Sequence, residues 1–370
     1  MGLNPIDQLM KEGLRAHVFP GAVLLVGKGN DILFLKAYGK ANLFSGRSTT
    51  QNTFFDLASL TKPLATTLAV AKLVDQQVLA LDQPVVEWLP LLASTDKKKI
   101  TLRHLLNHTS GFPAHRPYFM ALKKIALEKR KQSILEMLQS TPLESPAGVN
   151  HRYSDLGFML LCRVVESVIP CTIDKFVKTE LYDPMGLSDL FFVDLSDRSQ
   201  TALAGRTQVA HFCAATELCP IRNRLLVGEV HDDNTWFAGG VDGHAGLFGN
   251  AKSINQLLRG LVDHLNGCVC PSLFSPKILS EILQLEKPCN LALGFDKPAK
   301  EGSSAGKHFS DRTVGHLGYT GVSFWLDLEK DITVILLTNR VHPTRWNNRL
   351  DYFRPRIHDQ LMEHYEIVSD

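Results

Sequence analysis

Two segments near the N-terminus have the apolar, β-branched and aromatic composition of strands. Residues 22–26 (AVLLV) and 32–38 (ILFLKAY) flank a glycine- and asparagine-containing turn at 27–31. This pattern predicts a β-hairpin. Residues 323–328 and 332–337 predict a second hairpin in the last fifth of the chain. The clearest strand signals therefore lie at the two ends of the chain.

The middle of the chain has apolar residues at helical spacing. This periodicity predicts helices over 62–76, 101–108, 133–139, 154–168 and 173–181. Thr101 is expected to cap its helix, and Gly111 to close the exit from this helix into the loop soon after His108. A terminal helix is predicted after Asn347, with Pro355 near its start or at a kink.

This layout predicts an α+β fold in which both chain ends form one antiparallel sheet, flanked by helices, with a mainly helical domain inserted. We expect residues 1–60 and 240–370 to form the sheet domain and residues 61–239 the helical domain. A junction of this kind commonly forms a cleft, so the active site is expected there.

The composition is that of a globular protein, with 44% hydrophobic and 21% charged residues among 370. With 40 basic and 38 acidic residues, there is no electrostatic case for nucleic acid or an anionic membrane as a partner. Lysine runs such as 97–99 are expected to be solvated surface. No apolar stretch approaches the roughly 20 residues that span a bilayer.

The first residues lack a basic region followed by an apolar one, which argues against a secretory signal. Seven scattered cysteines suit reduced thiols, so we predict a cytoplasmic protein. No metal or cofactor is expected. Cys268-Val-Cys270 is too tightly spaced for a zinc site, and His211, Cys213 and Cys219 lack a clear fourth ligand.

The most informative motif is Ser59-Leu-Thr-Lys62, between an apolar approach and an apolar helical run. Residues three apart share one face of a helix, so the Lys62 amine can lie beside the Ser59 hydroxyl. A serine at a helix start also has a free N–H for a developing oxyanion. Two other tetrads have the same spacing but lie in predicted loops: Ser94/Lys97 and Ser304/Lys307.

Two further groups can supply chemistry. Tyr153 precedes an apolar helix and could act as a general acid or base if Lys62 lies nearby, while Asp155 could accept a hydrogen bond from Lys62 or a substrate amide. The alternative is that Ser154 or Asp155 only caps the helix.

A third group is His316-Leu-Gly318-Tyr319. Gly318 allows a backbone or ligand to approach the strand closely, the Tyr319 N–H could complete an oxyanion hole, and His316 could add a hydrogen-bond donor. The alternative there is a glycine-rich turn.

Together and in this order, these groups resemble the serine β-lactamase and penicillin-binding protein family, in particular its class C β-lactamase, esterase and D,D-peptidase branch. That family has Ser-x-x-Lys, Tyr-x-Asn and Lys/His-x-Gly, and the segment 101–111 also resembles it. The resemblance implies a β-lactamase/transpeptidase-like fold, with Ser59 as the acylated nucleophile, Lys62 as its partner base and Tyr153 as the proton relay. The N–H groups of Ser59 and Tyr319 would form the oxyanion hole.

The chain departs from the β-lactamases of this branch at two positions. Asp155 replaces an asparagine, and an ionised carboxylate only accepts hydrogen bonds and favours a protonated Lys62. His316 replaces a lysine, and a neutral histidine attracts a substrate carboxylate less strongly. Both changes resemble esterase, peptidase and amidase members more than efficient β-lactamases.

The segment 228–248 is dense in glycine, histidine and aspartate and is expected to form a structured loop. It resembles a subgroup that includes an atypical penicillin-binding protein and amidases that strip peptide from N-acetylmuramic acid. His231 and Asp232 could line the cleft, or could only hold its wall. His244, between small residues, is expected to pack. Residues 338–343 also resemble this subgroup, with structural roles.

The sequence therefore predicts a serine hydrolase that forms a Ser59 acyl-enzyme on an ester or amide. The substrate would be a small-molecule ester, an amide or a peptidoglycan-derived muropeptide. The alternative is a non-catalytic protein that binds a ligand or penicillin on the same fold. The oligomeric state is left open.

Overall fold

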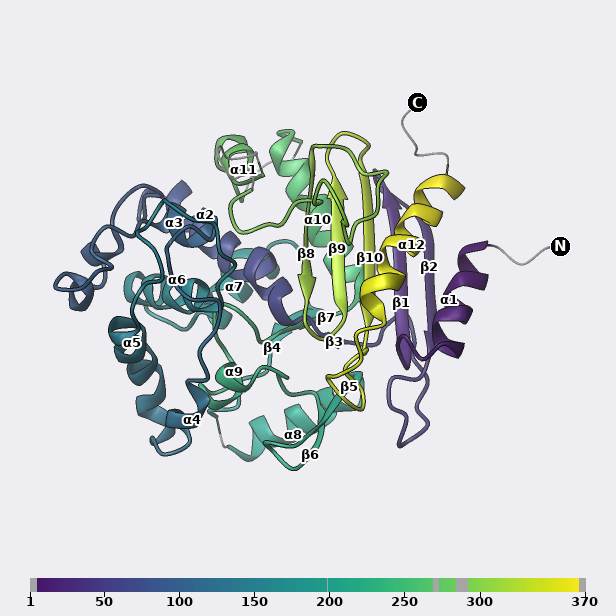
Figure 1. The fold of residues 1–370 in the computed structure, drawn as a ribbon, viewed down its shortest axis with the longest axis horizontal. Coiled ribbons are helices and arrows are strands. Elements are labelled where there is room, and N and C mark those ends of the chain that lie inside the picture. The colour runs from purple at the N-terminus through teal and green to yellow at the C-terminus, as the bar shows by residue number, and fades with distance from the viewer. Residues whose placement is uncertain (1–4, 198, 269–272, 284–291, 366–370) are drawn as a thin grey trace.

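A five-stranded antiparallel sheet, in the order β2-β1-β10-β9-β8, forms the right-hand part of the molecule in Figure 1. The computed structural model describes residues 5–197, 199–268, 273–283 and 292–365. The strands are β1 (Gly21–Lys28), β2 (Asp31–Gly39), β8 (Thr313–Gly318), β9 (Val322–Asp327) and β10 (Ile332–Thr338). Both predicted hairpins are confirmed, and β1 pairs with β10, so the two chain ends share one sheet.

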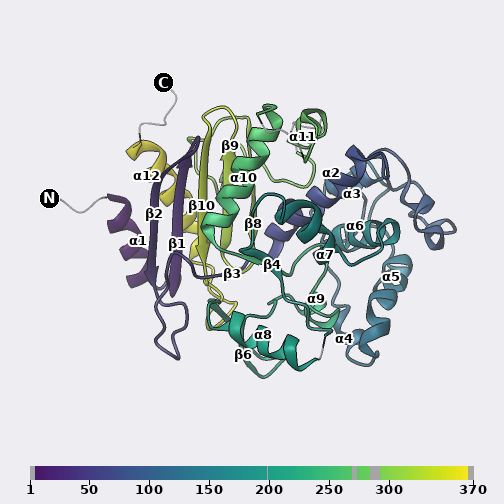
Figure 2. The ribbon, with the colours of Figure 1, turned by 180° about the vertical axis from the view of Figure 1, so that it is seen from behind.

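Helices cover both faces of this sheet. In β1, Ala22, Leu24 and Val26 pack into a core with α1 (Pro5–Arg15) and α12 (Leu350–His364), whereas Val23 and Leu25 face the larger core that includes α10 (Ala251–Leu265). Figure 1 shows α12 in front of the sheet, and Figure 2, from behind, shows α10 in front. Since successive strand side chains point to opposite faces, a fully apolar β1 is what a sheet buried on both sides requires.

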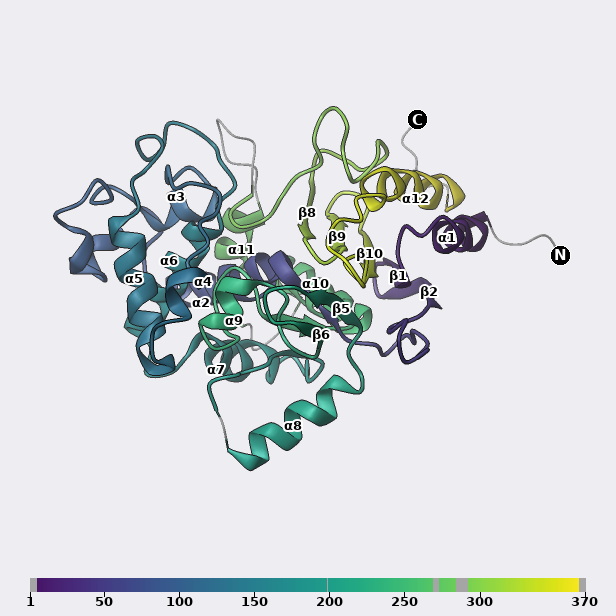
Figure 3. The same ribbon diagram turned by 60° about the horizontal axis from the view of Figure 1, so that its bottom comes forward.

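The rest of the chain is largely helical and contributes to the larger core through buried side chains. Its α-helices are α2 (Leu68–Asp75), α3 (Leu102–Leu106), α4 (Phe119–Leu122), α5 (Arg130–Ser140), α6 (Asp155–Val168), α7 (Ile173–Val177), α8 (Gln200–Ala210), α9 (Asp233–Phe237) and α11 (Pro276–Leu283). Thr101 caps α3, as predicted, and Gly111 follows the end of this helix with φ +83°. Figure 3 shows α8 standing away from the sheet.

Several elements differ from the sequence predictions. The middle of the chain also holds short strands: β3 (Phe55–Asp56) and β4 (Leu190–Phe192) pair with β7 (Leu247–Gly249), and β5 (Ala215–Cys219) pairs with β6 (Arg224–Val227). The predicted helix 62–76 begins as a π-helical turn, and His316 and Gly318 belong to strand β8 rather than to a turn. Strands β3 to β7 contain too few residues for an alternation of apolar and polar positions to be recognised in the sequence.

Lys97 was predicted to be solvated and is instead buried, with its ammonium beside Asp96 and over the Phe112 ring. The five described cysteines are free thiols, and Cys270 lies outside the described residues. Within the described ranges, no single helix is long and apolar enough to cross a membrane. Only α6 and the following segment to Tyr182, bent by 75° relative to each other, pass such a test as a pair.

Candidate active site

Ser59 lies in a 3₁₀ turn, Ala58–Leu60, between strand β3 and the π-helical turn Lys62–Thr67. The preceding Ala58 has φ +46°, a conformation that costs an L-residue about 1–3 kcal/mol and is typical of functional sites. Buried Asp56 holds this turn, because its carboxylate accepts the Ala58 N–H at 2.9 Å and the His231 N–H at 2.6 Å. The nucleophile candidate is thus fixed by its backbone.

The Lys62 ammonium is completely buried and donates to three acceptors. These are Ser59 Oγ at 3.0 Å, Asp155 Oδ1 at 2.8 Å and the His244 carbonyl at 3.3 Å. A lysine ammonium has three N–H donors and no acceptor, so this arrangement uses every proton. The geometry is that of a charged Lys62 with no lone pair free to take a proton from Ser59.

The pKa shifts of Lys62 and Asp155 agree with a charged Lys62. Burial would lower the pKa of Lys62, but the neighbouring Asp155 and Tyr153 outweigh it and raise that pKa above its usual value. Burial would likewise raise the pKa of Asp155, but Lys62 holds it well below its usual range. The site therefore rests as Lys62 cation and Asp155 anion. The expectation that Asp155 favours a protonated Lys62 is confirmed in direction.

The Lys62 ammonium lies over the ring of Tyr153, with the Nζ atom 4.7 Å from the ring centroid. Burial raises the pKa of Tyr153 to about 12, although Lys62 and hydrogen bonding to Lys62 and Ser59 oppose the rise. The phenol is thus neutral near pH 7 and can both donate and accept. Ser154 caps α6 by accepting the Gly157 N–H, so the capping alternative is true of Ser154 while Tyr153 faces Lys62.

Gly318 places the end of β8 against the Ser59 turn. A Cβ atom on Gly318 would lie 2.8 Å from the Leu57 carbonyl oxygen and 2.3 Å from a Val322 methyl, so only glycine fits. Thr320 Oγ1 donates to the Asp56 carbonyl at 2.7 Å and ties the turn after β8 to the same support. The Tyr319 N–H, like that of Ser59, makes no hydrogen bond within the described chain, as an oxyanion donor requires.

His316 was expected to add a hydrogen-bond donor to the cavity, but a neutral His316 ring in this position leaves only an acceptor. Its Nδ1 lies 2.8 Å from the Leu317 carbonyl, which only accepts, so Nδ1 carries the proton. Nε2 is buried and has no partner among the described residues. Burial lowers the pKa of His316, which keeps the ring neutral and leaves Nε2 as an acceptor.

His231 and Asp232 both line the cavity, and each has one polar side-chain atom engaged by a neighbouring residue. His231 Nε2 lies 3.1 Å from Glu217 Oε2, and the ring stacks on Tyr319 with centroids 5.7 Å apart. Asp232 caps α9 by accepting the Thr235 N–H at 2.7 Å. Both residues therefore hold this loop in place and also line the cavity.

Sequence reasoning missed three residues that contact the Ser59 turn or the Lys62–Asp155 pair. His244 was expected only to pack, yet its carbonyl accepts from Lys62 and its Nε2 lies 3.0 Å from Asp232 Oδ1. His115 Nδ1 lies 3.6 Å from Asp155 Oδ2 at the cavity surface. Asp56 supports the Ser59 turn. Only the glycine- and histidine-rich composition around His244 carried a signal in the sequence.

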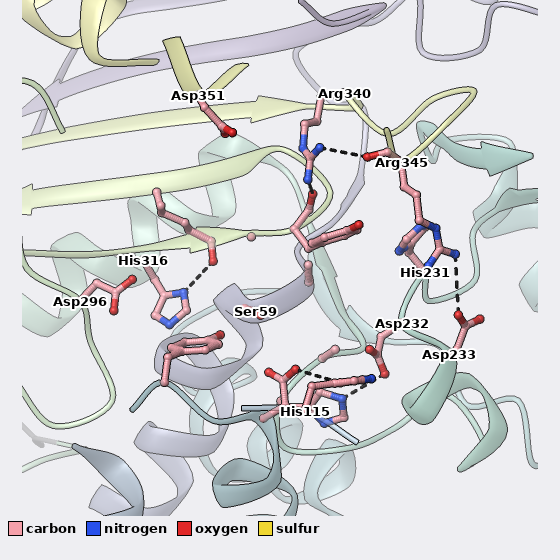
Figure 4. A pocket seen from close by; sticks show the side chains of 18 of the residues that line it. Ser59, His115, His231, Asp232, Asp233, Asp296, His316, Arg340, Arg345 and Asp351 are labelled. Carbon is pink, nitrogen blue, oxygen red and sulfur yellow. Dashed lines mark hydrogen bonds and ion pairs between the residues drawn. The ribbon is translucent and has the colours of Figure 1, made fainter. Parts of the chain in front are cut away.

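Ser59, Tyr153 and Asp155 line a cavity of about 720 Å³, part of which is shown in Figure 4. Ser59 lies between a wall formed by His115 and Asp232 and a wall formed by Arg340 and Asp351, as the labelled side chains show. The volume matches that of small-molecule sites in proteins. Within the described residues, no group of three or more histidine, cysteine or acidic side chains is placed to hold a metal ion.

Known proteins resemble this chain in sequence and in fold. The β-lactamase family model matches residues 6–354. A protein of Escherichia coli K12, provisionally named a D-alanyl-D-alanine carboxypeptidase, is 33% identical over 366 residues, covering 92% of this chain and 82% of its own. A Salmonella agona protein with the same name is 32% identical over 353 residues, covering 88% and 79%.

Two solved structures share the fold at lower identity. EstCE1, a hydrolase with promiscuous acyltransferase activity, has a TM-score of 0.73 at 20% identity, covering 96% of this chain and 97% of its own. The octameric penicillin-binding protein homologue from Pyrococcus abyssi has a TM-score of 0.74 at 20% identity, covering 98% and 78%. The β-lactamase/transpeptidase-like fold expected from the sequence is thereby confirmed.

Proposed function

Because this chain belongs to the β-lactamase family of serine hydrolases, we propose that it cleaves an ester or amide through an acyl-enzyme on Ser59. The observation that carries the proposal is the hydrogen bond from the buried Lys62 ammonium to Ser59 Oγ, with Asp155 fixing that ammonium from the other side. A cation at this position stabilises negative charge that develops on the serine oxygen.

We propose Tyr153 as the proton relay, because Lys62 has no free lone pair. As Ser59 Oγ bonds to the substrate carbonyl carbon, its proton passes to the Tyr153 oxygen, and the Tyr153 hydroxyl proton passes in the same event to the leaving oxygen or nitrogen. Tyr153 is therefore a neutral phenol before and after the transfer, and the bond between the carbonyl carbon and the protonated leaving atom then breaks. Water next attacks the acyl carbon, its proton passes to Tyr153 while the Tyr153 proton passes to Ser59 Oγ, and the ester bond to Ser59 breaks. Lys62 stays a cation throughout, and the N–H groups of Ser59 and Tyr319 would hold the oxyanion.

As the first substrate class we propose N-acylated peptides that end in D-alanyl-D-alanine, such as those derived from peptidoglycan. Support comes from the names of the relatives at 31–33% identity. Small esters form the second class, because the neutral His316 offers no donor to a carboxylate. β-Lactam hydrolysis should be slow, because Asp155 and His316 replace the asparagine and lysine of the β-lactamases of this branch.

Intact-protein mass spectrometry after incubation with a fluorophosphonate, and separately with penicillin, tests the nucleophile. We expect one stoichiometric adduct in the wild type, none in Ser59→Ala, and an unchanged adduct in the control Ser94→Ala, which removes the exposed serine of another Ser-x-x-Lys tetrad. A penicillin adduct that persists supports a peptidase, and one that turns over supports a β-lactamase. An unlabelled Ser59 with both reagents would favour a ligand-binding protein instead.

A further inference from the structure

The carboxylate of Asp296 differs from those of the other four aspartates that line the cavity. Each of those four has a basic neighbour: Lys62 beside Asp155, His244 beside Asp232, Arg222 beside Asp233, and Arg340 and Arg354 near Asp351. The side chain of Asp296 forms no hydrogen bond or ion pair with the described residues. The carboxylate that acts on the pKa of Lys297, the next residue, is that of Asp311. The negative charge of Asp296 is therefore open to a partner from outside the chain.

Asp296 acts on two histidines, and burial lowers the pKa of both. These are His316 and His151, and in each case the nearby Asp296 carboxylate opposes the shift without cancelling it. Both rings are therefore neutral near pH 7, and neither supplies a positive charge that would compensate Asp296.

Backbone hydrogen bonds hold Asp296 beside strand β8. The Asp296 N–H donates to the Gly315 carbonyl at 2.7 Å, and the Gly315 N–H donates to the Asp296 carbonyl at 2.9 Å. Gly315 is the residue before His316, and Figure 4 shows Asp296 and His316 at the same end of the cavity. The Asp296 carboxylate is thus carried by a backbone position that the edge of the sheet fixes.

The buried His316 ring adds a second acceptor at this end of the cavity. The side chain is 1% exposed, and its Nε2 has no partner among the described residues. Leu317, which follows it in the cavity wall, has an apolar side chain and offers no donor. A carboxylate placed here would meet two acceptors and a like charge. A positively charged group with N–H donors would satisfy both acceptors.

This end of the cavity lies on the side where the leaving group departs. The rings of Tyr153 and His316 have centroids 5.9 Å apart. Because Tyr153 is the proposed donor of the proton to the leaving atom, the leaving group lies on the Tyr153 side of Ser59. We propose that Asp296 and His316 form a subsite for a primary ammonium group on the leaving group of the substrate. This inference rests on the proposed function and narrows its second substrate class, the small esters, to esters whose alcohol carries an amine.

A matched pair of esters tests the subsite without requiring the natural substrate. The phenylacetyl esters of 3-(aminomethyl)phenol and 3-(hydroxymethyl)phenol have leaving groups of nearly the same shape, and only the first is charged at pH 7. Each kcat/KM is divided by the rate constant for uncatalysed hydrolysis of the same ester at that pH, which removes the difference in leaving-group reactivity. In the wild type we expect the normalised value to be about 5- to 30-fold higher for the ammonium ester. Hydrogen bonds to charged groups are the strong ones, while the partial exposure of Asp296 weakens its share.

Asp296→Asn keeps the shape of the side chain and removes its charge, so it should reduce this preference at least about threefold. Asp311→Asn is the control, because Asp311 is exposed, does not line the cavity, and loses the same charge close to the start of β8. It should retain the wild-type preference. Equal normalised values for the two esters in the wild type, or an unchanged preference in Asp296→Asn, would overturn the subsite. The wild-type comparison decides the matter even if the variant does not fold.

Failure of the subsite and failure of the proposed function give different results. If Ser59 is labelled by a fluorophosphonate and both esters are cleaved equally well, the hydrolase stands and the subsite is wrong. If Ser59 is not labelled and neither ester is cleaved, the hydrolase is wrong. Calorimetry with 3-(aminomethyl)phenol and 3-(hydroxymethyl)phenol then tests the subsite directly, and binding of the second phenol as tightly as the first would reject it.

Discussion

Asp155 accepts a hydrogen bond from Lys62 at 2.8 Å, and the two charges neutralise each other beside Ser59. The ammonium is held by a carboxylate rather than by a neutral amide, so its proton is hard to remove. This relationship makes Lys62 a fixed cation in the proposed mechanism, with Tyr153 as the group through which protons move.

Asp155→Asn should therefore change the alkaline side of the pH profile. Without the carboxylate, burial dominates and the pKa of Lys62 falls. Because the proposed mechanism needs the cation, kcat/KM should decline as pH rises through this lowered pKa, whereas the wild type should retain activity to higher pH. Ester hydrolysis measured across pH 6–11 (about half-unit steps) checks this.

The control for this experiment is Asp311→Asn, which removes an exposed carboxylate and should keep the wild-type profile. A contrary result would be an Asp155→Asn activity that rises with pH over the same range. That outcome would identify neutral Lys62 as the working base.

Gly318→Ala should disable catalysis with little change in ligand binding. The new methyl group would displace the Leu57 carbonyl, which it would approach to 2.8 Å, and so move the Ser59 turn. A displacement of about 1 Å in a catalytic group can cost about 100-fold in rate. Steady-state kinetics should show this loss in kcat.

Gly205→Ala is the matched control, since a Cβ there meets nothing within 4 Å and α8 is exposed. It should keep full activity and gain up to about 1 kcal/mol of helix stability. Wild-type kcat in Gly318→Ala would show that β8 does not need this close approach.

Tyr319→Ala separates the backbone of Tyr319 from its side chain. The substitution keeps the N–H proposed for the oxyanion hole but removes a half-exposed ring that lies between His231 and Arg340. We expect kcat within about threefold of wild type and a raised KM, because only substrate contacts are lost. A fall in kcat of about 100-fold or more, as for a lost oxyanion donor, would mean that the ring itself acts in the chemistry.

Glu217→Gln should weaken the cavity wall in a pH-dependent way. Burial would raise the pKa of Glu217, but hydrogen bonds from His231 and Arg345 lower it to about 2. The ionised form therefore stabilises the fold above its unfolded pKa of about 4.3, and this stabilisation is lost as pH falls towards 2. Thermal unfolding should show a Tm lower than wild type by about 5 °C at pH 7.

The two Tm curves should converge near pH 2 if the ion pairs are the cause. Substitution of the exposed Glu128 by glutamine should leave the wild-type curve unchanged at every pH. A constant Tm difference between Glu217→Gln and wild type down to pH 2 would point to packing rather than charge.

The sequence predicted those parts of the fold and site that local pattern determines. The two hairpins are continuous apolar runs, and the Thr101 and Ser154 caps are local hydrogen bonds, so each could be inferred from a few neighbouring residues. The charge state of Lys62 was harder to predict, because it depends on contacts with residues that lie 93 and 182 positions away in the sequence.

The roles of two arginines could not be inferred from the sequence, because they depend on which charged side chains remain without an ion pair to an acidic partner after the chain has folded. Residues 338–343 were assigned structural roles. This holds for Asn339, whose Oδ1 accepts the Gly21 N–H, but Arg340 lines the cavity. Arg354 carried no signal at all, since a buried arginine that forms no ion pair with the described residues is visible only when every neighbour is in place.

The pairing of β1 with β10 also sets when this protein can become active during its synthesis. Val23 pairs with Leu337, so the central strand pair joins residues more than 300 positions apart. A growing chain on the ribosome cannot complete this sheet, or the β8 edge that supports the Ser59 turn, until strands β8 to β10 have emerged. The nucleophile is thus assembled only after these strands have been made, and a chain that terminates before β8 would carry the Ser-x-x-Lys motif without a working site.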